Sequence, residues 1–436
     1  MLSLIASVFI LVIALLAWRQ SSGLFSLPSF IMLYIVFLDL GALHFYRTQG
    51  HLTFLFVLLM AFFYFLGMLV ASAIMKSKSR VKDISLTFYS PFNVPLLKLS
   101  LTISCIISLC ISMYRVLKFG APLFSGEQYT VGIIMVTGGL NRLLYALGPC
   151  GLLVIALLAY ALYKAEGEGS LKYLALMSFV LHIAFEILQG GKAAGIMPFL
   201  LMLMVMFYVN RKIPKKTVVV IVGVALISSL LISYFWTGGL SFSQYFQLYF
   251  YRTTVDAALH LDYLLYEWAP TSQYLFGGTV WLEIKRIAAQ LGFAAKEPLF
   301  KEIIANLRVG RPVETVTGIS PELSVFGNLG YANFGILGAV LVAIVLGCFV
   351  RLVDISLYSR RAMNCFSFVL WMYFIYHLLG FVRAGDLIIG LEKYIVEVTP
   401  VLLMICSIYT YMALPYPKAM RWRKLVKPVG GGNGEG

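Results

Sequence analysis

Long, nearly uninterrupted apolar runs dominate the chain. A helix needs about 20 mostly apolar residues to cross the hydrocarbon of a bilayer, and about eleven runs approach that length. They lie near residues 1–18, 27–46, 51–75, 98–117, 140–163, 170–189, 193–209, 217–235, 330–350, 363–383 and 398–414. Hydrophobic residues make up 61% of the chain and charged residues only 12%, which is rarely compatible with a water-soluble fold. The pattern predicts an all-α polytopic membrane protein with about eleven transmembrane helices, in a range of about ten to twelve.

Basic residues gather in the short connectors and predict the orientation. Clusters of Lys and Arg occur at 76–82, 211–216, 351–361 and 418–427. Because cytoplasmic loops are enriched in Lys and Arg, these clusters alternate correctly only with the N-terminus outside and the C-terminus inside. The net charge of +15 is thereby attributed to the connectors, and no nucleic-acid partner is expected. Arg19 follows the first apolar run and no basic residue precedes it, which favours a retained first span over a signal peptide.

One long segment, residues 236–320, is not apolar enough to lie in a bilayer. The chain is therefore predicted to consist of transmembrane helices 1–8 (1–235), a large outward-facing, partly helical loop (236–320), transmembrane helices 9–11 (321–414) and a basic cytoplasmic tail (415–436). We found no internal repeat of the kind that many transporters show.

The loop carries cations on the side of the membrane where the positive-inside rule does not require them. Arg252, Asp256 and His260 are spaced i, i+4 and i+8, which places them on one face of a helix. Arg308 and Arg311 flank a glycine and precede a proline, as expected for a rigid loop around an anion. The alternative is a solvated helix on which Arg252 pairs with Asp256. The pattern favours anion binding by the loop.

A glycine-rich turn offers a second anion site. In the stretch LQGGKAAG, Lys192 joins two predicted spans, and free backbone N–H groups with an ammonium can cradle a phosphate. The alternative is a lysine that extends to the membrane interface. His182 and Glu186, at i and i+4, are interpreted as a hydrogen-bonded intramembrane pair and not as a catalytic one. The loop has no DxD-like acidic cluster for a divalent cation, so no metal is expected there.

Three stretches resemble the Wzy-type polymerases, a bacterial family that builds O-antigen and related polysaccharides. They are GGKAAG (190–195); YRTT around Arg252 followed by IKRIAAQLGFAAKEP (284–298); and ISPELSVFGNLGYANFGILGA (319–339), which contains an NFGxxG segment leading into the next span. The chain departs from the family where Lys192 replaces a common arginine and where an acid expected shortly before NFG is absent. Glu322 lies further upstream.

The resemblance implies a glycosyl transfer at the outer leaflet of the bacterial inner membrane, without metal or cofactor. The glycan would leave undecaprenyl diphosphate and be attacked by a hydroxyl of an incoming lipid-linked repeat unit. Its implied partners are this lipid-linked oligosaccharide, membrane lipids and a chain-length regulator protein, and its implied fold resembles the lipid-dependent (GT-C-like) glycosyltransferases and the O-antigen ligases. The diphosphate or glycan would contact the expected cations Lys192, Arg252, Arg286, Arg308 and Arg311. The general base would be His260, Asp256 or Glu322, with His260 preferred.

Other functions share part of this pattern. An O-antigen ligase uses the same donor chemistry with lipid A–core as acceptor. A lipid-linked oligosaccharide flippase predicts charges spread over many spans and no long outward loop. An ion-coupled transporter would use His182 and Glu186 as a relay and leaves the loop unexplained.

The arginine at the start of the predicted loop helix gives a direct test. Arg252→Ala should abolish surface polymer while leaving the amount of protein in the membrane unchanged, because it removes a cation and not a packing group. Polysaccharide gels and immunoblots of the membrane fraction measure the two quantities. A normal polymer ladder in this variant would show that Arg252 is not part of the site.

Overall fold

The computed structural model describes most of the apolar part of the chain and about two thirds of the predicted loop. The described residues are 2–46, 51–75, 86–121, 139–188, 196–237, 243–244, 247, 251, 255–268, 274–291, 293–312 and 323–414. The statements below concern these residues.

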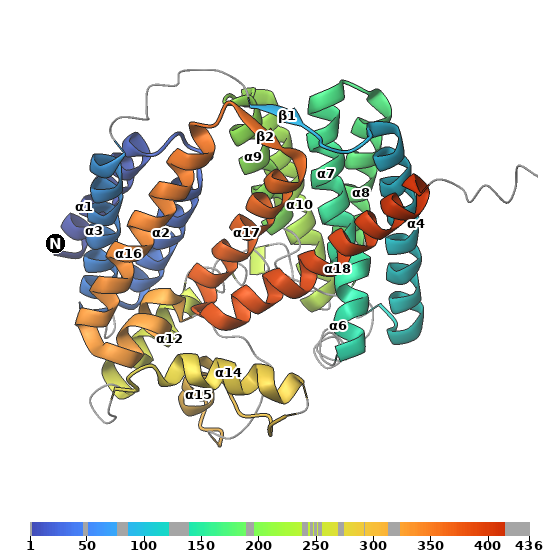
Figure 1. Ribbon diagram of the computed structural model, residues 1–436. Coiled ribbons are helices and arrows are strands. Elements are labelled where there is room, and N and C mark those ends of the chain that lie inside the picture. Colours follow the sequence, from blue (N-terminus) through green and yellow to red (C-terminus); the bar gives the residue numbers. More distant parts are fainter. Residues whose placement is uncertain are drawn as a thin grey trace, which may run out of the picture.

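Helices coincide with the predicted apolar runs (Figure 1). The first eight runs correspond to α1 (Leu2–Gln20), α2 (Leu27–Tyr46), α3 (His51–Ile74), α4 (Val94–Phe119), the continuous series α6 (Gly139–Tyr145), η1 (Ala146–Cys150) and α7 (Gly151–Glu166), α8 (Gly169–Leu188), α9 (Met197–Asn210) and α10 (Lys215–Thr237). The last three runs correspond to η5 (Phe326–Tyr331) with α16 (Ala332–Tyr358), to α17 (Cys365–Ala384) and to α18 (Leu387–Ala413).

Seven helices in the described part of the chain are long and apolar enough to cross a membrane. They are α3, α4, the α6–η1–α7 series, α8, η5–α16, α17 and α18, whereas α1, α2 and α9 contribute shorter apolar stretches. The all-α membrane class is therefore confirmed, and the count of about eleven spans stays a prediction.

Two of the last three helices begin earlier than their apolar runs predict. The run at 398–414 is only the second half of α18, which starts at Leu387. The search for long apolar runs leaves 387–397 out of the predicted span, because this stretch contains Glu392, Lys393 and Glu397. The helix tolerates Glu392 because Arg142 of α6 pairs with it. It tolerates Glu397 because His377 and Tyr373 of α17 contact that carboxylate. Likewise, the run at 330–350 begins at Phe326 as a π-helical turn, η5.

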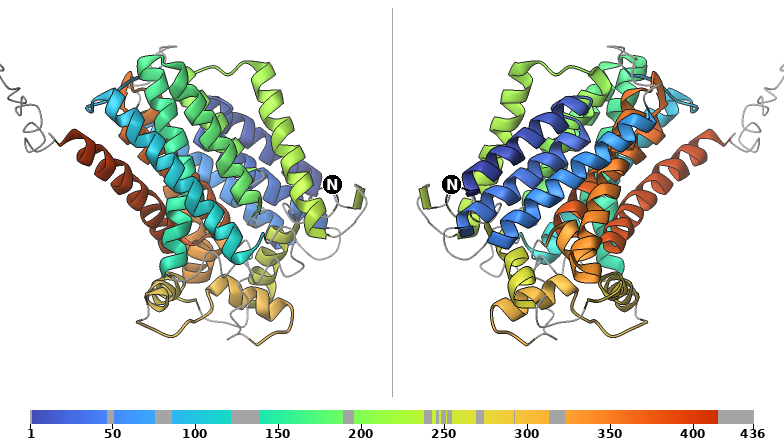
Figure 2. Two further views of the ribbon diagram at one scale, coloured as in Figure 1. Left: turned by 90° about the vertical axis from the view of Figure 1, so that its right-hand side faces the viewer. Right: turned by 90° about the vertical axis from the view of Figure 1, so that its left-hand side faces the viewer.

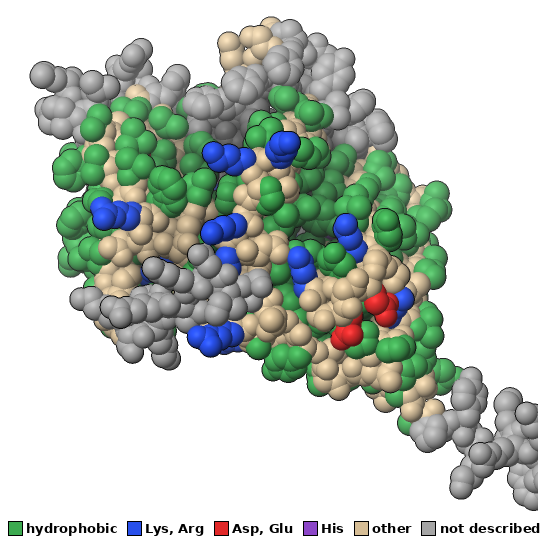
Figure 3. Space-filling view, turned by 90° about the horizontal axis from the view of Figure 1, so that it is seen from above, with side chains coloured by type: hydrophobic (Ala, Val, Ile, Leu, Met, Phe, Trp, Pro, Cys, Tyr) green, Lys and Arg blue, Asp and Glu red, His purple; other side chains and the backbone are tan. Residues whose placement is uncertain are grey.

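The described parts of the loop lie at one end of the helices (Figures 1 and 2). They form α12 (Asp256–Tyr263), the π-helical turn η4 (Leu264–Trp268), α14 (Gly278–Gln290) and α15 (Phe300–Arg308). At the opposite end, β1 (Thr87–Tyr89) and β2 (Ala362–Asn364) form a short parallel pair in which Phe88 lies opposite Met363. The view onto that end shows several Lys and Arg side chains and fewer acidic ones (Figure 3).

The NFG segment is a kink that fastens the loop to α16. Phe334 and Gly335 leave helical geometry, and Gly335 has φ +66°. A Cβ on Gly335 would lie 2.7 Å from the Tyr274 ring, so both the backbone angle and the space require glycine. Asn333 Oδ1 accepts hydrogen bonds from the backbone N–H groups of Gly277 (2.9 Å) and Thr279 (3.3 Å). Asn333 therefore supplies the N-terminal cap of α14 from a distant part of the chain.

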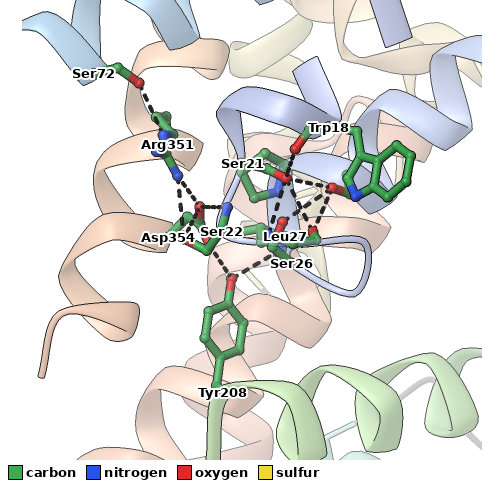
Figure 4. Close-up of polar contacts among 12 residues, drawn as sticks. Trp18, Ser21, Ser22, Ser26, Leu27, Ser72, Tyr208, Arg351 and Asp354 are labelled. Atoms are coloured by element: carbon green, nitrogen blue, oxygen red, sulfur yellow. Dashed lines mark hydrogen bonds and ion pairs between the residues drawn. The ribbon is translucent and has the colours of Figure 1, made fainter. Parts of the chain in front are cut away.

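A buried carboxylate ties several helices together near the basic end (Figure 4). Asp354 on α16 forms an ion pair with Arg351 and accepts hydrogen bonds from Tyr208 Oη (2.9 Å) and from the N–H and Oγ of Ser22 (3.1 and 2.8 Å). Arg351 Nε also donates to Ser72 Oγ at 3.1 Å. Arg351, predicted to be part of a basic cytoplasmic connector, is thus a buried structural residue.

Helices α3 and α16 cross with their backbones almost in contact. A Cβ on Gly67 would lie 2.1 Å from the carbonyl oxygen of Ile344, and one on Gly347 would lie 2.0 Å from that of Tyr64. Small residues at a crossing allow this approach between membrane helices, where packing replaces the hydrophobic effect as the main attraction.

Substitution at this crossing should lower stability. Gly347→Ala forces the helices apart and should cost about 1–3 kcal/mol, as overpacking of a core does, with a matching fall in the thermal unfolding midpoint of the detergent-solubilised protein. Gly223→Ala in α10 is the control, because a Cβ there meets no atom within 4 Å. Equal midpoints for the two variants would contradict the close crossing.

Candidate functional site

An apolar groove runs between α16, α17 and α18, with a volume of about 390 Å³. Its walls include Val345 and Phe349 from α16, Phe374 and Phe381 from α17, and Leu391 from α18. Val345 is 57% exposed, so the groove opens sideways, toward the surroundings of the helix bundle. A groove of this composition suits a hydrocarbon chain.

His377 connects this groove to a set of buried polar groups. It contributes to the wall of the groove, and its Nε2 lies 3.2 Å from Glu397 Oε2 on α18. Tyr373 Oη donates a hydrogen bond of 2.8 Å to the same carboxylate oxygen. Glu397 therefore has two partners from α17, as a carboxylate at membrane depth requires.

A strip of charged residues follows one side of α18 next to the groove. Asp386, Lys393 and Glu397 are spaced i, i+7 and i+11, which brings them to the same side of the helix. Asp386 forms a buried ion pair with Lys301 of α15. Lys393 is exposed and, within the part of the chain that the structure describes, forms no hydrogen bond or ion pair. We call these three residues, with Lys301, the charged strip.

An ion pair on the neighbouring side of α18 joins it to α6 and α14. Arg142 of α6 pairs with Glu392, and its Nη1 donates to Gln290 Oε1 at 2.5 Å. α14 is also attached directly, since Glu283 Oε2 accepts the N–H groups of Ile388 (2.6 Å) and Ile389 (3.1 Å) at the start of α18. The loop is thus bonded to the charged end of α18.

His182 and Glu186 do not bond to each other. His182 Nδ1 lies 2.8 Å from the carbonyl oxygen of Pro149, inside the π-helical turn η1. Glu186 Oε1 accepts a hydrogen bond of 2.8 Å from Tyr145 Oη. Each residue is thus held by the α6–η1–α7 series, and the predicted pairing of the two is wrong. His182 Nε2 is buried and has no hydrogen-bond partner among the described residues.

Of the predicted base residues, only His260 has a described side chain. It is 4% exposed on α12, which packs against α2, α3 and α15. The backbone of Asp256 begins α12, but its side chain lies outside the described residues, as does the whole of Glu322.

The predicted anion-binding residues are spread over the loop. Arg286 is buried, with its guanidinium paired to Glu302 and donating to the carbonyl oxygen of Glu297 at 2.9 Å. Arg308 is half-buried at the end of α15, and Arg311 is exposed just beyond it. Lys192 and Arg252 lie outside the described residues. Among the described members of this set, Arg286 is therefore already neutralised by the loop itself.

Sequence reasoning missed most of the charged strip. Its members Lys301, Lys393 and Glu397 are not among the site residues that the sequence predicts. The available signal was the presence of three ionisable residues within 391–398, directly before an apolar run, since ionisable groups in spans mark functional sites. The run-length rule instead placed that stretch in a connector.

Comparison of the chain with protein-family models, with curated proteins and with solved structures gives no match. Within the described residues, no group of three or more His, Cys, Asp and Glu side chains is arranged to hold a metal ion.

The environment of Glu283 predicts a pH-dependent stability. Burial and the nearby Asp386 raise the pKa of Glu283 from 4.5 to about 7, although the N–H groups at the start of α18 and Lys301 act in the opposite direction. The folded protein therefore holds a proton that the unfolded chain has released. Stability should fall as the pH rises from about 4.5 through about 7, by at most about 1.4 kcal/mol per pH unit for one proton.

Thermal unfolding midpoints between pH 4.5 and 8 measure this effect. The fall should be smaller in Glu283→Gln, which cannot ionise. It should persist in the control Glu297→Gln, because Glu297 is a half-exposed partner of Lys285. An identical pH dependence in wild type and Glu283→Gln would contradict the assignment.

Proposed function

We propose that this protein is a polysaccharide polymerase of the bacterial inner membrane. It transfers a growing glycan from undecaprenyl diphosphate to an incoming lipid-linked repeat unit at the periplasmic face. The observation that carries the proposal is the direct junction of an apolar groove with the charged strip at His377. A polyprenyl-diphosphate-linked oligosaccharide has the same division, with a hydrocarbon chain joined to an anionic head.

The groove binds the hydrocarbon chain of the substrate. Its lining is apolar, it opens sideways, and its end near Leu387 and Gly390 lies beside Asp386. A lipid-linked substrate can therefore enter from the bilayer and keep its tail out of water, which is favourable in proportion to the apolar area that stays buried. The diphosphate then lies at the end of the groove where the loop is attached.

Lys393 contacts the diphosphate. It is the member of the charged strip that the described residues leave without an ion pair, whereas Asp386 and Lys301 neutralise each other. A cation at this position stabilises the negative charge that develops on the leaving diphosphate. The predicted cations of the loop, including Arg252, Arg308 and Arg311, bind the remaining phosphate and glycan oxygens, and His260, Asp256 and Glu322 remain the candidate bases.

The distribution of charge supports the periplasmic placement of the loop. Lys212, Lys215 and Lys216 are exposed at the end of the bundle that holds the two strands, as is Arg361. The helices of the loop lie at the opposite end (Figures 1 and 2). By the positive-inside rule, the strand-bearing end is cytoplasmic and the loop is periplasmic.

Surface polysaccharide from a strain lacking the gene tests the function. Loss of a polymerase leaves lipid A–core carrying a single repeat unit, because ligation continues without elongation. Bare core with polymer accumulating on the polyprenyl carrier would instead identify a ligase and overturn the proposal.

Complementation of that strain tests the site. Gly390→Phe places a ring in the groove and Lys393→Met removes the cation, so each should reduce the long-chain ladder strongly at a normal protein level. The matched controls are Gly223→Phe, at an open position on α10, and Lys172→Met, an exposed lysine on α8. A normal ladder in both Gly390→Phe and Lys393→Met would contradict the assignment of the substrate to this groove.

A further inference from the structure

Helix α14 turns polar residues toward the protein and apolar residues outward, which is the reverse of a helix on a water-exposed surface. Two of its three charged residues, Glu283 and Arg286, are 1% and 7% exposed and face the protein. The third, Lys285, is partly exposed and pairs with Glu297. Trp281, by contrast, is 57% exposed, and Ile284 is also exposed on the same outer face. A helix on a water-covered surface normally buries its apolar stripe and exposes its charges. The outer face of α14 is therefore largely apolar.

The exposed face of α14 continues the lipid-facing surface of α16. Phe276, which precedes α14, contacts Phe334 of α16 with ring centroids 6.2 Å apart. Next to Phe334 on α16, Leu337 is 78% exposed, on a helix that is long and apolar enough to cross the membrane. A single apolar surface thus extends from the outward end of α16 onto α14.

The direction and place of α14 fit the boundary between hydrocarbon and water. The helix lies across the ends of the membrane helices and not along them, and one side view shows it nearly end-on at the edge of the bundle (Figures 1 and 2). Its attachment to the kink at Asn333 and to the start of α18 fixes this direction. Tryptophan is enriched at membrane interfaces, where the ring is partly in hydrocarbon and its N–H reaches polar groups.

We propose that α14 is an interfacial helix whose outer face, formed by Trp281, Ile284 and Leu291, lies in the outer boundary layer of the bilayer, with Phe276 beside it. Its inner face holds the start of α18 through Glu283. The lipid surface is its partner, and burial of the aromatic and aliphatic side chains there supplies the attraction. This inference does not depend on the proposed glycosyl transfer.

The consequence concerns how the groove is placed in the membrane. α14 is bonded to the first residues of α18, and Leu387, Gly390 and Leu391 of the same helical turns line the groove. An α14 held at the interface therefore sets the depth of the groove's outward end. The head of a lipid entering the groove then meets the charged strip at the level where lipid headgroups lie.

Spin labels on the full-length protein in lipid nanodiscs of phosphatidylethanolamine and phosphatidylglycerol test this placement. Nitroxides are attached at Trp281→Cys or Ile284→Cys after replacement of Cys110, Cys348 and Cys406 by serine, since these are the native cysteines that are not buried. Lys296→Cys, in the exposed segment between α14 and α15, is the matched control. Collision rates with oxygen, which concentrates in hydrocarbon, are compared with those of a water-soluble nickel chelate.

The expected result is a higher ratio of oxygen to nickel collisions at 281 and 284 than at 296. Nickel accessibility at 281 and 284 equal to that at 296 would place α14 in water and overturn the proposal. Protection of both labels from both reagents would also overturn it, because a second protein surface and not lipid would then cover the helix. Activity is not needed for the readout, so a failure of the proposed function leaves this test intact.

Discussion

The cost of placing charge in a bilayer organises this structure. An ionisable side chain at membrane depth needs a partner from within the protein, because lipid tails supply none. Helix α18 carries Glu392, Lys393 and Glu397 in its first half, and its neighbours supply Arg142 from α6 and both His377 and Tyr373 from α17. These pairings link α18 to α6 and α17. They also produce a polar interior directly beside an apolar groove, which is the arrangement that the proposed function uses.

The same constraint makes the loop part of the membrane structure. α15 contributes Lys301 to Asp386, and α14 contributes Glu283 to the first N–H groups of α18. Those N–H groups have no partner within their own helix, so the carboxylate both satisfies them and fixes the position of α14. On the other side, Asn333 caps α14 from the kink in α16. The loop helices are therefore held by α16 and α18, two of the three membrane helices that line the groove.

The NFG segment acquires a physical explanation from this attachment. Asn333 bonds to the start of α14, and Gly335 has a positive φ in contact with Tyr274. Each residue serves the docking of the loop onto the N-terminal end of α16. The likeness that suggested a polysaccharide polymerase therefore rests, in this stretch, on residues that build the site's framework and not on residues that carry its chemistry.

By itself, the sequence determined the all-α membrane class, the position of nearly every long helix and the separation of the basic connectors from the loop. These follow from local quantities, namely the length of apolar runs and the charge of the segments between them. Only the tertiary structure decided that α18 begins before its apolar run, that Arg286 is neutralised by Glu302 and that Lys393 is left without an ion pair among the described residues. The reason is that a charge in a span is tolerated or neutralised by partners distant in sequence. Asp386 and Lys301 are 85 residues apart, and no local pattern brings them together.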